Sequence, residues 1–145
     1  MAASFASFGP TLIVLDQSNP FRMTVRGAIT GPGQVQAAGI MTISLPHGAS
    51  ITSFGFTGSL GYGVVNANLF RNPLSSGVGF DLLASRQFST TGNQDFNQFG
   101  TVLPASVVDN ANYTYLIEAS AAARNVPFGQ QFTAFIYGFG MILDV

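Results

Sequence analysis

The stretch Tyr113-Thr-Tyr-Leu-Ile-Glu-Ala119 alternates its side chains with a period of two, which is the spacing of an extended strand with one buried side. Its two tyrosines and its isoleucine fall on one side, which we expect to face the core, and the residues between them fall on the other. By contrast, no window sustains helical spacing, and the alanine-rich residues 119–124 are too few and lack a cap for a helix. The stretch therefore predicts a strand in an all-β protein.

Short β-rich runs separated by Gly, Pro, Asn and Ser recur along the whole chain. Eight or nine such runs, roughly 8 to 15 residues apart, are typical of an antiparallel β-sandwich, most naturally a jelly roll. We expect strands at residues 11–15, 21–29, 39–45, 50–58, 64–71, 79–88, 99–103, 113–122 and 131–143. Turn-forming residues separate them at Gly31-Pro-Gly33, Asn72-Pro73, Thr91-Gly-Asn93 and Asp109-Asn-Ala-Asn112. The pattern predicts a single-domain, jelly-roll-like antiparallel β-sandwich.

The N-terminal segment differs from the rest of the chain, because small residues surround two spaced aromatics, Phe5 and Phe8. We expect an N-terminal arm and first strand at residues 1–20, followed by the β-sandwich domain at residues 21–145. Such an arm either pairs within its own domain or reaches over a neighbour and adds a strand there. The sequence leaves both arrangements open.

The scarcity of charge is the strongest compositional signal. Charged residues make up 8% of the chain, there is no lysine, and the net charge is −1; about 25% is typical. The sequence contains no basic patch, so it predicts no nucleic-acid partner. No apolar run approaches the roughly 20 residues of a membrane helix. Few charges and a net charge near zero favour association, so we expect the chain to bind copies of itself. The alternative is a monomer whose surface consists of Ser, Thr, Asn, Gln and Gly.

The final apolar strand, residues 131–143, is expected to be covered on both sides. A strict period of two places Phe135, Tyr137, Phe139, Met141 and Leu143 on one side, and small or aliphatic residues on the other. One cover would be the core, and the other a partner subunit lying close over the glycines. The predicted assembly interface comprises Phe5, Phe8, Leu12, Val14, Ile136, Gly138, Gly140 and Ile142.

A second candidate surface is Asn93-Gln-Asp-Phe-Asn-Gln-Phe99, which combines polar and aromatic residues in a predicted loop. Lectin-like sites place an aromatic platform beside amide and carboxylate groups. The candidate ligand loop comprises Asn93, Asp95, Phe96, Asn97 and Phe99, with a glycan or cell-surface receptor as its expected partner. A plain connection between strands is the alternative.

The chemistry of catalysis is poorly represented. His47, which is the only histidine, lies in a Pro-His-Gly turn without a nucleophile motif, and Glu118 and Asp109 are the nearest candidates for paired acids. Asp95, Asp109 and Asn110 carry oxygen ligands suited to calcium, but their spacing matches no known loop and favours structural turns. The chain has no cysteine. We therefore predict no enzyme activity, no catalytic or metal residue and no cofactor.

Four short pieces carry a resemblance to known proteins. They are Leu45-Pro-His-Gly-Ala-Ser-Ile-Thr52, Leu69-Phe-Arg71, Val108-Asp-Asn-Ala-Asn-Tyr-Thr-Tyr115 and Tyr137-Gly-Phe-Gly-Met-Ile142. Together they resemble a broad group of little-characterised bacterial and phage-associated jelly-roll β-sandwich proteins. The resemblance implies an extracellular or virion-borne, non-enzymatic domain. This chain departs from the group in its apolar ending, where such proteins often finish in a polar Arg-x-Glu-Tyr type strand.

These observations lead to two hypotheses for function. The first is a structural subunit that self-assembles into a filament, ring, trimer or virion component through apolar strand faces and the N-terminal arm. The second is a carbohydrate- or receptor-binding, lectin-like module that uses the predicted loop. Neither hypothesis requires nucleic acid or membrane insertion.

Overall fold

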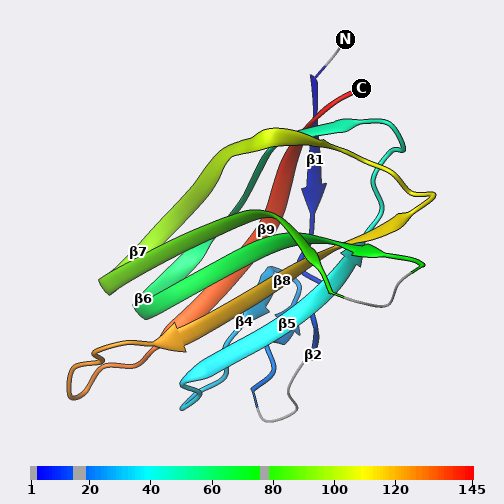
Figure 1. Ribbon diagram of the computed structural model, residues 1–145. Helices are drawn as coiled ribbons and strands as arrows, with labels where there is room; N and C mark the ends of the chain where they lie inside the picture. The colour runs from blue at the N-terminus through cyan, green and yellow to red at the C-terminus, as the bar shows by residue number, and fades with distance from the viewer. Residues whose placement is uncertain (1–2, 15–18, 76–78) are drawn as a thin grey trace.

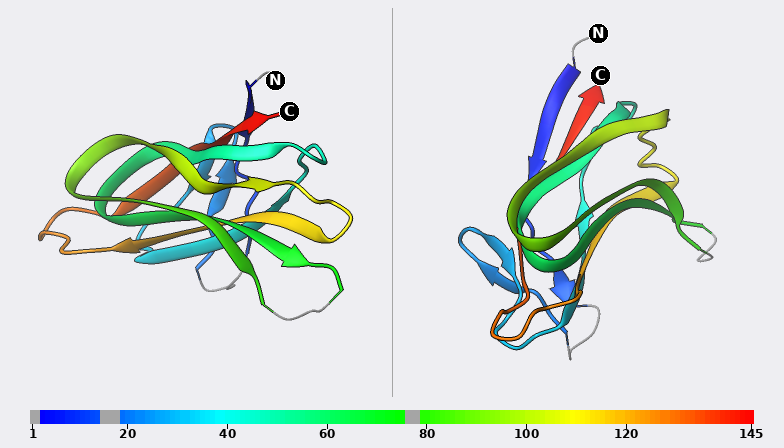
Figure 2. Two further views of the ribbon diagram at one scale, coloured as in Figure 1. Left: turned by 45° about the horizontal axis from the view of Figure 1, so that its top comes forward. Right: turned by 90° about the vertical axis from the view of Figure 1, so that its left-hand side faces the viewer.

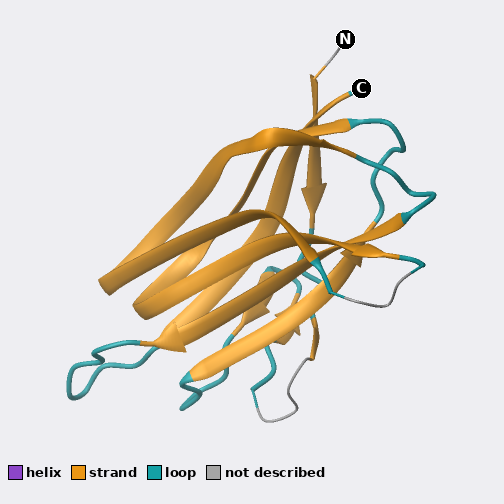
Figure 3. Cartoon of the chain, in the orientation of Figure 1, coloured by secondary structure: helices purple, strands orange, loops and turns teal. Residues whose placement is uncertain are grey.

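The computed structural model describes residues 3–14, 19–75 and 79–145, and within them it contains strands, turns and loops but no helix (Figure 3). The strands are β1 (Ala3–Phe8), β2 (Ile13–Val14), β3 (Arg22–Thr24), β4 (Gly27–Ile29), β5 (Gln36–Ile43), β6 (Ser50–Pro73), β7 (Asp81–Val107), β8 (Tyr113–Ala123) and β9 (Thr133–Asp144). Position 15, the end of the first predicted strand, lies outside the described residues. No helix in the described part of the chain could span a membrane.

Two long strands connect the layers of the sandwich. Residues 50–61 of β6 pair with β9, residues 63–73 pair with β8, and β7 follows β6 along nearly its whole length, always antiparallel. The first layer therefore holds β1, β9, the first half of β6 and the second half of β7, with β4 and β3 beside β9. The second layer holds β2, β5, β8 and the remaining halves of β6 and β7. Figures 1 and 2 show the hairpin of β6 and β7 curling from one layer to the other. The predicted all-β, jelly-roll-like β-sandwich is confirmed.

Several predicted boundaries are wrong because the chain bends where a break was expected. The chain bends at Tyr62, which has a glycine on each side and a φ of 57°. The register between β6 and β7 shifts at the same place. The predicted strands 50–58 and 64–71 are thus one strand, β6. Opposite this bend, the predicted turn at residues 91–93 and the predicted loop at residues 93–99 both lie inside β7.

Elsewhere a single predicted strand is divided. Residues 21–29 form a hairpin, β3 and β4, in which Thr24 pairs with Gly27 across Val25 and Arg26. The Thr24 hydroxyl donates to the Gly27 carbonyl (3.0 Å) and accepts from the Arg26 N–H (3.2 Å). Gly27 has a φ of 146°, a conformation that residues with a Cβ rarely adopt. These local bonds turn the chain back within two residues.

The N-terminal arm pairs within its own chain. β1 lies antiparallel to the second half of β9, with Ala3 opposite Asp144 and Phe8 opposite Phe139 (Figure 2). β4 occupies the same side of β9 further along, opposite Phe135 and Ile136. Of the two arrangements that the sequence left open, the structure contains the intramolecular one.

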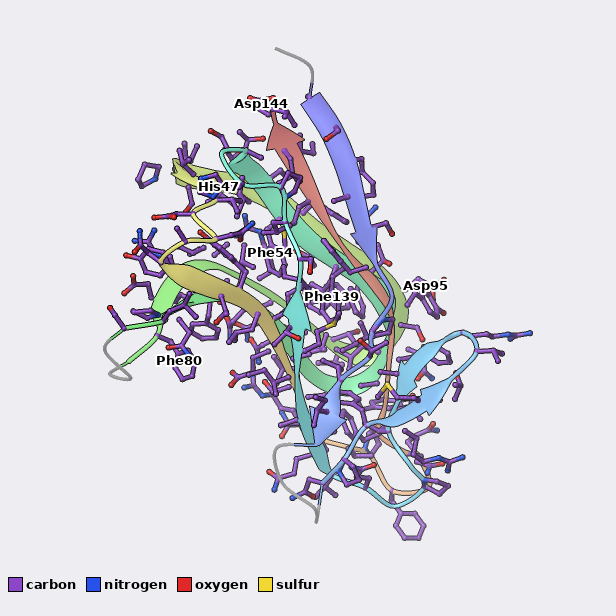
Figure 4. The ribbon with its side chains drawn as sticks, turned by 90° about the vertical axis from the view of Figure 1, so that its right-hand side faces the viewer. His47, Phe54, Phe80, Asp95, Phe139 and Asp144 are labelled. Carbon is purple, nitrogen blue, oxygen red and sulfur yellow. The ribbon has the colours of Figure 1, made fainter. Side chains whose placement is uncertain are left out.

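Aromatic and aliphatic side chains from both layers fill the core. Phe56 stacks against Phe139 (centroids 6.3 Å apart) and meets Phe96 edge-on (5.0 Å). Phe54 and Phe139 lie between the layers, whereas Asp95 and Phe80 lie at the margins (Figure 4). In β8, the prediction that Tyr115 and Ile117 face the core is confirmed. Leu116, expected on the outer side, is also buried, in the row between Thr42 and Phe70.

The alternation predicted for β9 is wrong because the strand contains an extra residue. Thr57 pairs with Gly138 and Gly58 with Ile136, so Tyr137 has no partner in β6. An extra residue reverses the sides of all residues beyond it. Ala134 and Ile136 therefore point into the core on one side of the shift, and Phe139, Met141 and Leu143 point into it on the other.

Arg86 lies in the half of β7 that belongs to the second layer, and its side chain bonds to backbone of the first layer. Its Nε donates to the carbonyl of Phe54 (3.0 Å) and its Nη2 to the carbonyl of Thr101 (3.0 Å). A Cβ at Gly100 would lie 2.9 Å from the guanidinium, so the glycine leaves the space that this group occupies. The charge therefore serves the fold by satisfying backbone carbonyls.

Candidate functional site

The outer face of the first layer is the candidate site. Along the first half of β6, Phe54 and Phe56 point inward, so Ser53, Gly55 and Thr57 point outward. Pairing extends this outward set across β1, β9 and β7. We call this surface the recognition face; its residues are Phe5, Ser7, Ser53, Gly55, Thr57, Ser59, Asn93, Asp95, Asn97, Phe99, Thr101, Thr133, Phe135, Tyr137, Gly138, Gly140 and Ile142.

Two phenylalanine rings form a platform at one end of the recognition face. Phe5 and Phe99 have ring centroids 6.3 Å apart, and their side chains are 62% and 38% exposed. The rings extend over a floor made by Gly55 and Gly140, which pair with each other. A Cβ at Gly140 would lie 2.6 Å from Cζ of Phe5 and 3.0 Å from Cε1 of Phe99, and a Cβ at Gly55 would overlap the Phe99 ring. The glycines are therefore what allows the rings to lie so close to the sheet.

A second aromatic pair lies further along β9. The rings of Phe135 and Tyr137 have centroids 4.9 Å apart, and Tyr137 is 46% exposed. The extra residue in β9 is what places Tyr137 on this side of the sheet. Tyr137 lies three positions before Gly140 in the sequence, which corresponds to about 10 Å along a strand. The recognition face thus offers two aromatic contacts along one direction.

Polar side chains of β7 line the other margin of the recognition face. Asn97 lies opposite Thr57, Asp95 opposite Ser59, and Asn93 opposite Gly61. A shallow hollow of about 240 Å³ is lined by Ser59, Leu60, Asn93, Gln94, Asp95 and Thr133. Within residues 3–14, 19–75 and 79–145, the side chains of Asn93, Asp95 and Asn97 make no hydrogen bond. Their donors and acceptors are free to bind a ligand.

Polar groups at the loop end of the sandwich are engaged in the fold. Asp109 accepts from the side-chain amide of Asn112 (2.7 Å) and from the N–H of Ala111 (3.1 Å), and these bonds lower the pKa of its carboxyl. Its own N–H donates to the Tyr115 hydroxyl (2.8 Å). Nδ1 of His47 accepts from the N–H of Asn110 (3.1 Å). The interpretation of Asp109 and Asn110 as turn residues is confirmed, whereas Asp95, which was also expected in a turn, lies inside β7.

Three further charged residues, Arg71, Asp81 and Glu118, lie on strands of the second layer or beside them. Nε of Arg71 donates to Asp81 (2.9 Å), and its guanidinium lies 4.2 Å from the centroid of the Tyr113 ring. Glu118 lies in the middle of β8, in the row between Ile40 and Asn68. Among the described residues, no three His, Cys, Asp or Glu side chains gather as metal ligands do.

A hollow on the outer face of the second layer lacks an aromatic platform. It measures about 270 Å³ and is lined by Asn19, Gln36, Ala37, Ala38, Asn66, Ser120, Ala121 and Ala122. Amide and hydroxyl groups are present there, but small side chains form its floor. The recognition face is therefore the stronger candidate, because it alone of these two surfaces combines rings with polar groups.

The structure merges the two sites that the sequence predicted separately. Four residues of the predicted interface lie on the recognition face: Phe5, Gly138, Gly140 and Ile142. Four residues of the predicted ligand loop lie there too: Asn93, Asp95, Asn97 and Phe99. The cover expected from a partner over Gly140 comes from the chain's own Phe5 and Phe99 rings. Pairing of β1 and β7 with their neighbours produces this single surface.

The other predicted site residues lie elsewhere. Leu12 and Ile136 are core residues, 6% and 0% exposed, and Phe8 packs against the core, so their assignment to an interface is wrong. Phe96 is 6% exposed, so its assignment to the ligand loop is also wrong. Side chains alternate along β7, and because Asp95 and Asn97 point outward, Phe96 points into the core. The side chain of Val14 lies outside the described residues.

Sequence reasoning missed several members of the recognition face. It placed Phe135 and Tyr137 on the core side, because the extra residue in β9 leaves no local signal. It also overlooked Thr57 and Ser59, although the alternation of large apolar with small residues in Ser53-Phe-Gly-Phe-Thr-Gly-Ser59 indicates an outer row.

Comparison with known proteins supports the fold. No family model and no curated protein matches the chain, so the resemblance proposed from short sequence pieces stays a prediction. Among solved structures, the chain is similar to a xylan-binding module, CBM15, with a TM-score of 0.52 and 10% identity over 98% of this chain and 97% of that one. It also matches the Eiger TNF of S. frugiperda, with a TM-score of 0.47 and 8% identity over 99% and 91% of the two chains. At this identity the similarity to the xylan-binding module shows a common β-sandwich fold.

Proposed function

We propose that the chain is a non-enzymatic binding module that takes a polysaccharide chain on the recognition face. The observation that carries the proposal is the combination of the Phe5–Phe99 platform with the unengaged Asn93, Asp95 and Asn97 on one face. A sugar ring presents apolar C–H groups on its faces and hydroxyls around its rim. The rings would stack on the former, while amides and a carboxylate would bind the latter.

Two further observations support this assignment. The platform and the Phe135–Tyr137 pair lie along one direction, which suits an extended polymer better than a single sugar. A protein of this fold is described as a xylan-binding module, so the fold is compatible with such a ligand. The choice of ligand class for this chain rests on its own side chains.

Titration calorimetry with soluble neutral polysaccharides, such as xylan, a β-glucan and a mannan, tests the proposal. Phe99→Ala should weaken binding about tenfold, because a lost aromatic contact of about 1.4 kcal/mol corresponds to that factor. Phe80→Ala removes an equally large exposed ring (57% exposed) outside the recognition face and should leave affinity unchanged. Equal affinities for both variants, or no binding to any polymer, would refute the assignment.

Asp95→Asn separates hydrogen bonding from charge. If the carboxylate accepts from sugar hydroxyls, the amide keeps one acceptor and should lose only part of the affinity, whereas Asp95→Ala should lose more. Thermal unfolding of each variant checks that the fold persists, which is expected because Asp95 is exposed and makes no hydrogen bond within the described chain.

A second function, self-association, is supported by a different observation. Large apolar side chains are exposed at several margins of the sandwich, including Ile13 (67%), Phe80 (57%) and Leu103 (83%). With a net charge of −1, little electrostatic repulsion opposes contact between copies. Light scattering over a range of concentrations tests this function, and a constant mass of 15.2 kDa would contradict it.

A further inference from the structure

Four strands form the open margins of the sheet. β2 and β3 end the strand order, β1 pairs only with β9, and β7 pairs only with β6. An edge strand presents unpaired N–H and C=O groups that can bind a strand of another chain. Natural proteins usually protect such edges by making them short or by adding charges, prolines or bulges. The four edges of this chain differ in that protection.

Three of the four edges carry protective features. β2 has two residues, and β3 has three, of which the first is Arg22, with Arg26 following in the turn. β7 is long, but it contains Pro104, which has no N–H, and it changes register where it bends opposite Tyr62. It also carries charged side chains, at Asp81, Arg86 and Asp95.

β1 has none of these features. Its six residues, Ala-Ser-Phe-Ala-Ser-Phe, include no charge, no proline and no glycine, and its pairing with β9 is continuous over residues 3–8. The side of β1 away from β9 has no partner among the described residues, and the right-hand view of Figure 2 shows the strand at the outer edge of the sheet, beside β9. A strand of this length spans about 20 Å, enough for a regular ladder.

We propose that β1 pairs antiparallel with β1 of a second copy, so that the two first layers form one continuous sheet. This inference rests on the self-association proposed above, but it assigns the contact to β1 and not to the exposed apolar side chains at the other margins. A two-fold axis makes the pairing isologous, so one strand supplies both halves. The pairing would also join the two recognition faces and bring the platforms that contain Phe5 next to each other. Because a six-residue strand buries little area, we expect a dissociation constant in the micromolar range or weaker.

Ser4→Lys tests the contact. Ser4 is exposed and, by the alternation of the strand, points away from the side that carries Phe5. In a two-fold pairing the new charges come close together across the axis and oppose association. Ser89→Lys introduces the same change at an exposed position on the β7 edge and is the matched control.

Analytical ultracentrifugation gives the readout. The wild type and Ser89→Lys should approach twice the 15.2 kDa chain mass as concentration rises, and Ser4→Lys should stay at 15.2 kDa. A monomeric wild type at millimolar concentration, or a dimer that Ser89→Lys disrupts and Ser4→Lys does not, would overturn the proposal. Saccharide affinity per chain should be unchanged in Ser4→Lys, so a failure of polysaccharide binding is observed separately.

Cysteine cross-linking provides a second measurement that does not depend on charge. The chain has no cysteine, so single cysteines introduced in turn at residues 3–7 report only their own proximity. Disulfide formation requires Cβ atoms about 4 Å apart. At least one of these variants should form a covalent dimer under mild oxidation, and Ser89→Cys should not. The absence of a cross-link at all five positions would contradict the pairing.

Discussion

Gly140→Ala tests whether the recognition face works through rings that lie close to the sheet. The added Cβ would lie 2.6 Å from Cζ of Phe5 and 3.0 Å from Cε1 of Phe99. Carbon atoms in ordinary contact are about 3.5 to 4.0 Å apart. The Phe5 ring must therefore retreat by about 1 Å and the Phe99 ring by about half as much. Both neighbours are side-chain atoms, so the backbone can remain in place.

The expected change in stability is small. Separating the ring pair costs about 0.5 to 1.5 kcal/mol, and alanine in a strand recovers about 0.5 to 1 kcal/mol relative to glycine. Gly140 is not among the residues with positive φ, so alanine introduces no backbone strain. Because Phe5 is 62% exposed, its displacement removes little buried area. The free energy of unfolding should therefore stay within about 1 kcal/mol of the wild-type value.

Polysaccharide binding should change more than stability. Displacing the platform should cost about 1 to 1.4 kcal/mol, or about five- to tenfold in the dissociation constant. Titration calorimetry measures the affinity, and urea denaturation measures the stability. Gly92→Ala is the control, because a Cβ there meets no atom within 4 Å. Unchanged affinity in Gly140→Ala, or a loss of stability above about 3 kcal/mol, would refute the reasoning.

Three further predictions concern the fold. Arg86→Leu should lower the free energy of unfolding by about 1 to 3 kcal/mol, because the carbonyls of Phe54, Ser85 and Thr101 lose their donor, and urea denaturation should show no such loss for the exposed Arg124→Leu. Tyr115→Phe should cost about 1 kcal/mol, because the N–H of Asp109 loses its acceptor; in the same assay Tyr113→Phe should be nearly neutral. Hydrogen bonds lower the pKa of Asp109, so its stabilising contribution is present at neutral pH and is lost as the pH falls below about 4. Asp109→Asn should remove that part of the acid dependence measured by thermal unfolding, and an unchanged acid profile would contradict it.

Local sequence patterns predicted the fold class and the sides of some strands correctly. In β8, alternation alone placed Tyr115 and Ile117 in the core. Turn chemistry identified the Asp109–Asn112 turn, since the Asp109 side chain bonds the backbone of Ala111. Both features depend on residues a few positions apart. They are therefore readable without knowledge of the partners across the sheet.

Other features depend on strands distant in sequence. Glycines around Tyr62 look alike whether a chain ends a strand or bends it, and only pairing with both β8 and β9 shows that β6 continues. The extra residue at Tyr137 exists only relative to β6. Each such register change reverses the sides of the residues beyond it, so an assignment by alternation fails there.

The sequence by itself determined the residue types of the candidate site and the scarcity of charge around them. Only the tertiary structure decided that Phe5, Phe99 and Gly140 meet, and that Asn97 lies on the same face while Phe96 and Ile136 point into the core. The physical reason is that side-chain alternation is a property of the local backbone, whereas the order and register of strands depend on hydrogen bonds and packing between distant segments.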